Sequence, residues 1–200
     1  MAATDVETKE RILHAAIASI DQGGDASLRV VEVAKNAGVS QGMIRYYFGD
    51  REQLVAEAKA LRFRTRYGFM LNEFREATSR CTTSDDFREL IIQVMKVVFT
   101  SDRSTLRLER NSDIGSAKDY EGLAAQIAEQ RDELCRDLAE VFEDARSRGL
   151  IRNDTDCIGV AASYLAFTHG ISLWEFGPEF VTRERLVKMF QIGLFATIFE

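Results

Sequence analysis

Residue types that perform catalysis or bind metals are few in this chain and poorly placed for either task. Its two histidines, His14 and His169, fall in different predicted domains, and no HExxH pattern or paired-cysteine spacing accompanies them. Cys157 and His169 are twelve residues apart, about 120° around a helix, so they would not face each other. The sequence also lacks a GxSxG elbow, a P-loop and a GxGxxG fingerprint. We therefore expect a protein that is not an enzyme and that holds no metal or cofactor.

Side chains suited to binding phosphate are concentrated in residues 29–66. This segment holds eight basic and four acidic residues, a net charge of +4, whereas the whole chain carries −6 and the remainder therefore −10. A local basic stretch on an acidic body can dock on phosphate groups without making the whole protein bind polyanions. From charge alone, a solvated helix face is the simpler explanation of the same residues.

One short run within this segment carries side chains that could recognise base edges from a helix in the major groove of DNA. Gln41 can form two hydrogen bonds with adenine, and Arg45 can do the same with guanine. Gly42 permits close approach of the backbone, and Met43 can contact a thymine methyl group. Arg51, at the start of the next predicted helix, can add a phosphate contact beside the positive helix N-terminus.

The residues before this run predict a helix-turn-helix. Ser27 is expected to cap a short helix that ends at Gly38, and Ser40 is expected to cap the next one. Val39 and Ile44 match a hydrophobic staple, which fixes the angle at which the chain enters the second helix. Many helical hairpins also use a glycine turn, so the spacing alone leaves both interpretations open.

The pattern of the remaining residues predicts a series of helices and hence an all-α fold. One proline in 200 residues favours helices, and apolar residues recur at helical spacing along most of the sequence. We expect an N-terminal three-helix helix-turn-helix domain over residues 1–50. A long helix should join it to a larger helical domain for ligand binding and dimerisation over residues 51–200.

Two C-terminal segments are unusually apolar. Residues 157–174 contain no Asp, Glu, Lys or Arg, but polar residues interrupt them and both flanks are acidic. These features favour a helix buried by protein on most sides over a membrane span. The last helix, residues 183–199, is apolar around most of its circumference, so one face should pack on the chain's own core and another on a second subunit. The expected interface residues are Ile158, Ala162, Leu165, Val187, Phe190, Leu194 and Ile198.

A small-molecule cavity is expected in the C-terminal domain. The apolar candidates for its lining are Phe63, Tyr67, Met70, Met95, Phe99 and Trp174. Arg107, Arg110 or His169 could supply polar contacts, and the two arginines, three residues apart, could hold a carboxylate. Ordinary core packing would explain the apolar residues, a solvated helix face the arginines, and a hydrogen-bonded buried histidine His169.

The cysteines and the first residues of the sequence indicate the cellular compartment of the protein. Three cysteines (Cys81, Cys135 and Cys157) cannot all pair within one chain, which favours free thiols over a disulfide scaffold. Residues 1–5 show no basic region followed by an apolar core, so no signal peptide is expected. We expect a cytoplasmic protein.

Several motifs, in order and at matching spacing over roughly residues 7–58, make the chain resemble the N-terminal domain of the tetracycline-repressor (TetR) family. They are Lys9-Glu10-Arg11-Ile12-Leu13 with Ala15-Ala16, then Gly23-Gly24, Val33-Ala34, Ala37-Gly38-Val39-Ser40, Gly42, Tyr47-Phe48 and Arg51-Glu52-Gln53-Leu54. The resemblance implies a homodimeric bacterial transcription regulator, usually a repressor, that a small molecule releases from a pseudo-palindromic DNA operator. The remainder of the chain resembles the family only in its architecture.

The resemblance also implies roles for particular residues, and the chain departs from the family at one of them. Tyr46 and Tyr47 resemble family tyrosines that contact phosphate or sugar, whereas Arg45 stands where a tyrosine is common. Ser27 or Arg29 would take the phosphate contact that a threonine commonly makes. The full set expected at DNA is Ser27, Arg29, Ser40, Gln41, Gly42, Met43, Arg45, Tyr46, Tyr47 and Arg51. The acidic net charge and Arg45 leave open a helical protein-interaction module, and an enzyme on this scaffold is a more distant third hypothesis.

Overall fold

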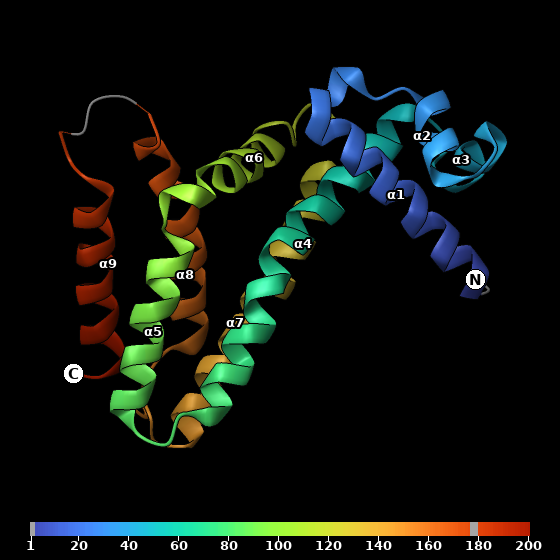
Figure 1. Ribbon diagram of the computed structural model, residues 1–200. Helices are drawn as coiled ribbons and strands as arrows, with labels where there is room; N and C mark the ends of the chain where they lie inside the picture. The colour runs from blue at the N-terminus through green and yellow to red at the C-terminus, as the bar shows by residue number, and fades with distance from the viewer. Residues whose placement is uncertain (1–2, 177–179) are drawn as a thin grey trace. The chain divides into compact units, whose positions relative to one another are not determined.

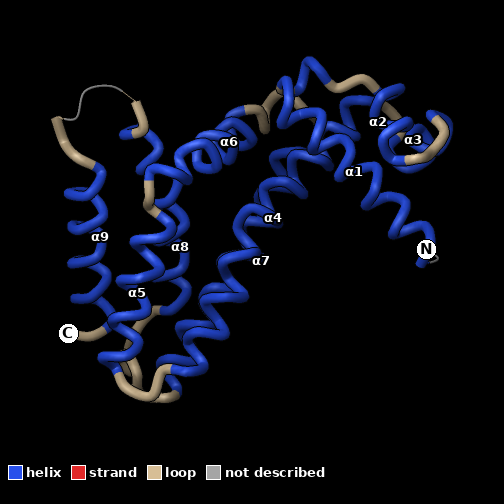
Figure 2. Tube along the Cα trace, in the orientation of Figure 1, coloured by secondary structure: helices blue, strands red, loops and turns tan. Residues whose placement is uncertain are grey.

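The computed structural model describes residues 3–176 and 180–200, without the side chains of residues 3–4 and 67–69. The described residues form α-helices and short 3-10 turns, and no strand occurs among them (Figures 1 and 2). The prediction of an all-α fold is confirmed. The α-helices are α1 (Ala3–Gly23), α2 (Val30–Ala37), α3 (Gln41–Phe48), α4 (Arg51–Arg80), α5 (Ser84–Val98), α6 (Ser104–Gly115), α7 (Leu123–Ser147), α8 (Cys157–Gly170) and α9 (Arg183–Ile198). The 3-10 turns are η1 (Asp25–Ser27), η2 (Ser101–Arg103) and η3 (Ile171–Trp174).

The chain divides into two compact units that exchange segments. The N-terminal unit comprises residues 1–65 and 113–130, and the C-terminal unit comprises residues 66–112 and 131–200. Helices α4, α6 and α7 each contribute residues to both units. The N-terminal unit is therefore larger than the segment 1–50 expected from the sequence, because the start of α4 and the α6–α7 connection belong to it.

Helices α1 to α3 and the first part of α4 surround the core of the N-terminal unit. Its buried residues are Ile12, Leu13, Ala16, Ile20, Leu28, Val33, Ala34, Ala37, Ile44, Phe48, Leu54, Val55 and Ala58. Helix α1 packs against α2, and α2 packs against α3. Between the last two, Gly38 adopts a left-handed conformation (φ 67°, ψ 36°) and its N–H donates to the carbonyl groups of Ala34 and Lys35. Glycine has no Cβ to clash there, so the residue both ends α2 and turns the chain into α3.

The helix caps of this unit follow the sequence prediction at Ser40 and depart from it at Ser27. The Ser40 Oγ accepts a hydrogen bond from the Met43 N–H at 3.2 Å, as expected for the cap of α3. The predicted cap at Ser27 is wrong, because α2 begins after Arg29 and has no side-chain cap. The Ser27 hydroxyl instead donates to the carbonyls of Ser19 and Gly24, at 3.0 and 2.7 Å, and closes the turn around η1. The Asp50 carboxylate accepts from the Gln53 N–H at 2.8 Å at the start of α4, where the sequence predicts a new helix.

The C-terminal unit has a core built around aromatic side chains. The rings of Phe74, Phe87 and Phe142 contact one another with centroid separations of 6.1–6.2 Å. Edge-to-face and offset pairs of this kind add to the stabilisation from burial alone. Helix α5 packs against α9 within this unit.

The apolar segment Cys157–Trp174 has a length and mean hydropathy (1.3) that would also suit a membrane span. The α-helix ends at Gly170, however, and the last four residues form η3. Within one chain 39% of the segment is buried, so burial by protein on most sides would require a second subunit. Helix α8 packs on the core through one side and leaves Ile158, Ala162 and Ala166 exposed.

Candidate functional sites

Helix α3 presents one face to solvent and the other to the core of the N-terminal unit. Ile44 and Phe48 are buried, at 2% and 4% exposure, whereas Tyr46 on the opposite side is 80% exposed. Gln41 and Arg45 are exposed as well. The buried face of α3 packs on the core, and Ser40 caps its first turn. The orientation of α3, and with it that of Gln41, Arg45 and Tyr46, is therefore held by the N-terminal unit. An exposed face of this kind can present Gln and Arg donors to base edges in a major groove.

The first turn of α3 also exposes backbone and side-chain groups that could approach DNA closely. Ser40 and Gly42 are exposed, and Met43 is 38% exposed. Arg29, just before α2, is exposed too, and it donates from Nη1 to the Ala26 carbonyl at 3.3 Å. We define the recognition surface as Arg29, Ser40, Gln41, Gly42, Met43, Arg45 and Tyr46.

Three residues expected at DNA hold the N-terminal unit together instead of lying free on its surface. The Tyr47 hydroxyl donates to the Asp5 carboxylate at 3.0 Å, and burial together with this hydrogen bond raises the pKa of Tyr47. Arg51 donates from Nε to the Leu28 carbonyl at 3.1 Å and also contacts the Asp25 carbonyl. Ser27 is engaged in the η1 turn. A phosphate contact from any of them would compete with these internal bonds, which sequence spacing could not reveal.

A buried polar cluster lies elsewhere in the N-terminal unit. Lys59, Arg62 and Asp113 are 1%, 5% and 0% exposed. Arg62 bonds the Asp113 carboxylate with two nitrogens, one of them Nε at 3.0 Å from Oδ2, and its Nη1 lies 2.7 Å from the Asp21 carboxylate. Lys59 Nζ lies 2.6 Å from the Asp25 carboxylate. We call these five residues the polar cluster; it ties α4 to the end of α1, to η1 and to the end of α6.

The sequence analysis did not single out this cluster. The one indication of it in the sequence is the spacing of Lys59, Arg62 and Arg66. They are three and four residues apart and therefore share one face of α4. Their burial depends on carboxylates that are distant along the chain.

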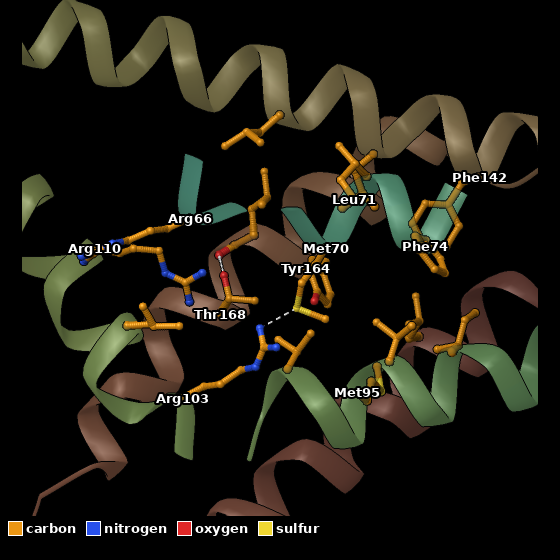
Figure 3. Close-up of a pocket in the computed structure, with 18 residues that line it drawn as sticks. Arg66, Met70, Leu71, Phe74, Met95, Arg103, Arg110, Phe142, Tyr164 and Thr168 are labelled. Carbon is orange, nitrogen blue, oxygen red and sulfur yellow. Dashed lines mark hydrogen bonds between the residues drawn. The ribbon is translucent and has the colours of Figure 1, made fainter. Parts of the chain in front are cut away.

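The C-terminal unit contains a cavity of about 90 Å³ that opens to solvent. A space of this size admits part of a small organic molecule. Its lining consists of Arg66, Met70, Leu71, Phe74, Ile91, Val94, Met95, Val98, Arg103, Leu106, Arg110, Leu134, Leu138, Phe142, Tyr164, Leu165, Thr168 and Leu194. Figure 3 shows this pocket with its polar and apolar side chains.

Some of the residues expected at the cavity line it and others lie elsewhere. Met70, Met95 and Arg110 are in the lining. Phe63 is buried in the part of α4 that belongs to the N-terminal unit, and Phe99 packs against the rings of Tyr164 and Phe167. Trp174 is 42% exposed, outside the lining. The predicted role of Tyr67 concerns a side chain outside the described residues.

Arg107 does not line the cavity; it is buried and bonded within its own chain. It is 1% exposed, and its guanidinium donates to the carbonyls of Val98 and Thr100 at 2.9 and 3.0 Å. Its Nε also donates to the Glu175 carboxylate at 2.6 Å. The alternative of a solvated face is wrong for this residue, because Arg107 is buried and binds a carboxylate of its own chain.

His169 is half-buried beside the cavity lining without being part of it. Its Nδ1 lies 2.9 Å from Asn111 Oδ1, and the Asn111 amide donates to the His169 carbonyl at 3.2 Å. Burial, and then the charge of Arg110, lower the pKa of His169 to about 4. The imidazole is therefore neutral at pH 7, in line with the alternative of a hydrogen-bonded histidine.

The residues expected at a dimer interface divide between the surface and the core. Leu165, Leu194 and Ile198 are 8%, 8% and 0% exposed, so their assignment to an interface is corrected: they face the chain's own core. Val187 and Phe190 are half-buried and pack against that core. Only Ile158 and Ala162 lie on the exposed face of α8. The exposed apolar face of α9 consists of Met189, Ile192 and Ala196, which the sequence analysis did not single out.

These features define a class: an all-α protein with an exposed helix-turn-helix recognition helix and a second helical unit that contains a cavity. Residues 12–58 match the family model described as bacterial regulatory proteins, tetR family. The match covers the helix-turn-helix segment, and over these residues the chain is similar to regulators of the TetR family.

Curated relatives match this chain over part of their length. It is 32% identical over 83 residues to the HTH-type transcriptional regulator BetI of Stenotrophomonas maltophilia, covering 40% of this chain and 38% of BetI. It is 31% identical over 103 residues to the HTH-type transcriptional regulator AcrR of Shigella flexneri, covering 52% of this chain and 47% of AcrR. The matched segments thus span less than half of either relative. Both relatives are named as transcription regulators.

The solved structures extend the likeness in fold to the whole chain. A Mesorhizobium loti protein assigned to the TetR-family transcriptional regulators has a TM-score of 0.72 with 17% identity, and the match covers 100% of both chains. At that identity the likeness concerns the fold alone.

Proposed function

We propose that this protein is a dimeric, ligand-responsive transcription regulator that acts in the cytoplasm. It binds a pseudo-palindromic DNA operator through α3, and a small-molecule effector in the C-terminal unit releases it. The observation that carries the proposal is the division of α3, which buries Ile44 and Phe48 while exposing Gln41, Arg45 and Tyr46.

The recognition surface supports DNA binding because its groups divide into base readers and backbone contacts. Gln41 and Arg45 are the candidates for direct readout of adenine and guanine. Arg29, Tyr46 and the first turn of α3 can contact phosphate or sugar, which orients the helix but carries no sequence information. The exposure of Arg45 also supports guanine readout at a position where a tyrosine is common in the family.

Dimerisation is supported by two exposed apolar faces in the C-terminal unit. Helix α8 exposes Ile158, which is 60% accessible, together with Ala162 and Ala166. Helix α9 exposes Met189 and Ile192, at 61% and 52%. A second copy that contributes the same two helices would cover these faces through an isologous interface. Sedimentation equilibrium should then give twice the mass of one chain, and Ile192→Glu should shift the protein towards monomer.

Release by an effector requires that the effector bind the DNA-incompetent state more tightly than the DNA-bound state. Helix α6 supports such coupling because Arg110 lines the cavity and Asp113, three residues later, belongs to the polar cluster. A ligand that contacts Arg110 can therefore act on a helix whose end is bonded to α4.

The test is selection of DNA from a random duplex library, followed by fluorescence anisotropy on the selected sequence. We expect a two-fold symmetric site and an affinity loss of at least about thirtyfold for Arg45→Ala, since each half-site loses one bidentate base contact worth about 1–3 kcal/mol. Arg80→Ala is the matched control, because Arg80 is an exposed arginine of the C-terminal unit (73%), and it should leave the affinity unchanged.

Sequence-indifferent binding, or equal effects of the two substitutions, would overturn the assignment of α3 as the reading helix. Absence of DNA binding would favour the alternative of a protein-interaction module.

A further inference from the structure

The charged side chains among the described lining residues of the cavity are all cationic. Three arginines, Arg66, Arg103 and Arg110, belong to its lining, and no Asp or Glu is among the described lining residues. The other described lining residues are thirteen apolar side chains together with Tyr164 and Thr168. A partly enclosed apolar space with several cations and no lining anion stabilises a bound negative charge.

The contact of Arg103 differs from those of arginines that pair with a carboxylate of the chain. Arg107 and Arg183, which do not line the cavity, both bond the Glu175 carboxylate. Arg66 in the lining is paired with Glu109. Arg103 instead lies with its Nη1 2.8 Å from the sulfur of Met70.

A thioether sulfur is a weak acceptor, whereas a guanidinium is suited to bidentate contact with a carboxylate. An entering carboxylate would therefore give Arg103 a much stronger partner than Met70. Arg110 also lines the cavity, and at 8% exposure its charge is poorly screened by water.

The apolar lining extends away from this charge. In Figure 3, Arg66, Arg110 and Thr168 lie on one side of the pocket, and Phe74 and Phe142 lie on the opposite side. Leu71 and Met95 also lie towards the aromatic side. The cavity thus has a cationic end and a hydrocarbon end.

We propose that the effector is an amphipathic organic carboxylate. Its carboxylate binds Arg103 and Arg110, and its alkyl or aryl body packs between Phe74, Phe142 and Met95. This inference rests on the proposed function for the word effector, but the binding preference is a property of the cavity alone. Neutral analogues lose the charged contact, and amines place a cation beside arginines.

The experiment compares matched ligands on the full-length protein by isothermal titration calorimetry at pH 7.5. Decanoate, decanol and decylamine share one alkyl chain, and 4-phenylbutyrate with 4-phenylbutanol repeats the comparison for an aryl body. We expect at least one carboxylate to bind about tenfold to hundredfold more tightly than its alcohol, as expected for charge-assisted hydrogen bonds, and decylamine to bind most weakly. The series showing the larger preference identifies an alkyl or an aryl body. Alcohols that bind as well as both carboxylates, or no binding by either carboxylate, would overturn the proposal.

Substitutions assign the preference to the cationic end. Arg103→Gln should remove most of the difference between carboxylate and alcohol while leaving alcohol binding nearly unchanged, and Arg103→Lys should restore part of it. Arg80→Gln, which removes an exposed arginine outside the lining, should change nothing. A preserved preference in folded Arg103→Gln would overturn the role of Arg103. The comparison of ligands on the unaltered protein decides the ligand class even if this variant does not fold.

The two proposals fail in distinguishable ways, because DNA binding is measured on the same preparation. Carboxylate binding without any DNA binding would uphold the cavity assignment and overturn the regulator. Sequence-specific DNA binding without any preference for carboxylates would uphold the regulator and overturn the effector class.

Discussion

Replacing Asp113 by Asn should destabilise the protein far more than the same replacement at an exposed site. Asp113 is fully buried, and it neutralises Arg62, which bonds both of its carboxylate oxygens, with Lys59 3.8 Å away. Removing one partner of a buried ion pair typically costs about 3–5 kcal/mol, because the remaining charge stays buried without compensation. Asn keeps one acceptor oxygen, and Arg62 keeps Asp21, so we expect about 3 kcal/mol.

The assay is thermal and urea unfolding monitored by circular dichroism, with Asp154→Asn as the control. Asp154 also pairs with an arginine, Arg152, but its side chain is 62% exposed, so its loss should cost at most about 1 kcal/mol. For a chain of 200 residues, 3 kcal/mol corresponds to a decrease in Tm of about 6–12 °C.

A double-mutant cycle separates the ion pair from general damage. Arg62→Met should cost less free energy in the Asp113→Asn background than in the unaltered protein, since the charge it removes has already lost that partner. If the two substitutions were additive and Asp113→Asn matched Asp154→Asn in Tm, the pair would not stabilise the N-terminal unit.

Three further predictions concern single positions. Gly38→Ala should cost about 1–2 kcal/mol in urea unfolding because of the left-handed backbone (φ 67°), and an unchanged midpoint would contradict that geometry. Ser40→Ala should cost about 1 kcal/mol through loss of the α3 cap, whereas Ser40→Asn, which can also cap, should cost less. The pKa of His169 is lowered to about 4 from 6.5, so the unfolded chain takes up this proton first as pH falls. His169 therefore reduces stability progressively between about pH 6.5 and 4, by at most about 3 kcal/mol. His169→Asn should flatten the pH dependence of unfolding over that interval, and identical pH profiles would refute the assignment.

The recognition surface was the feature most accessible to sequence reasoning. The glycine that ends α2, the serine that caps α3 and the buried positions Ile44 and Phe48 all act within a few residues of one another. Local geometry and helical periodicity then decide which side chains of α3 face outward. Ser27 shows the limit of this reasoning, because its hydroxyl can cap a helix or close a preceding turn, and here it closes the turn.

Features that depend on distant partners were not predictable in the same way. Spacing places Arg103, Arg107 and Arg110 near one another on successive turns, but only Arg107 reaches Glu175, which is 68 residues away. Similarly, Arg62 becomes buried because Asp113, 51 residues away, pairs with it. The sequence shows how many charges a helix carries but not which of them the fold neutralises.

The apolar character of α9 posed a related difficulty. A helix that is apolar on most sides does not reveal which stripe faces its own core. The apolar pattern predicts Leu194 and Ile198 at the interface, but they lie in the core, while Met189 and Ile192 lie exposed. The packing of α9 against α5 decides which side of α9 is buried. The periodicity of the sequence does not reveal this packing.

Under the proposed function, the polar cluster sets an energetic requirement on release. A movement that separates the end of α6 from α4 must break the bond between Arg62 and Asp113, at a cost of several kcal/mol if no new partner replaces it. An effector can supply that free energy only through its preference for the displaced state, and 3 kcal/mol corresponds to a preference of about 150-fold. An effector with equal affinity for both states would leave operator binding unchanged however tightly it bound. The charge contacts of Arg103 and Arg110 therefore matter for regulation only to the extent that they strengthen when α6 moves.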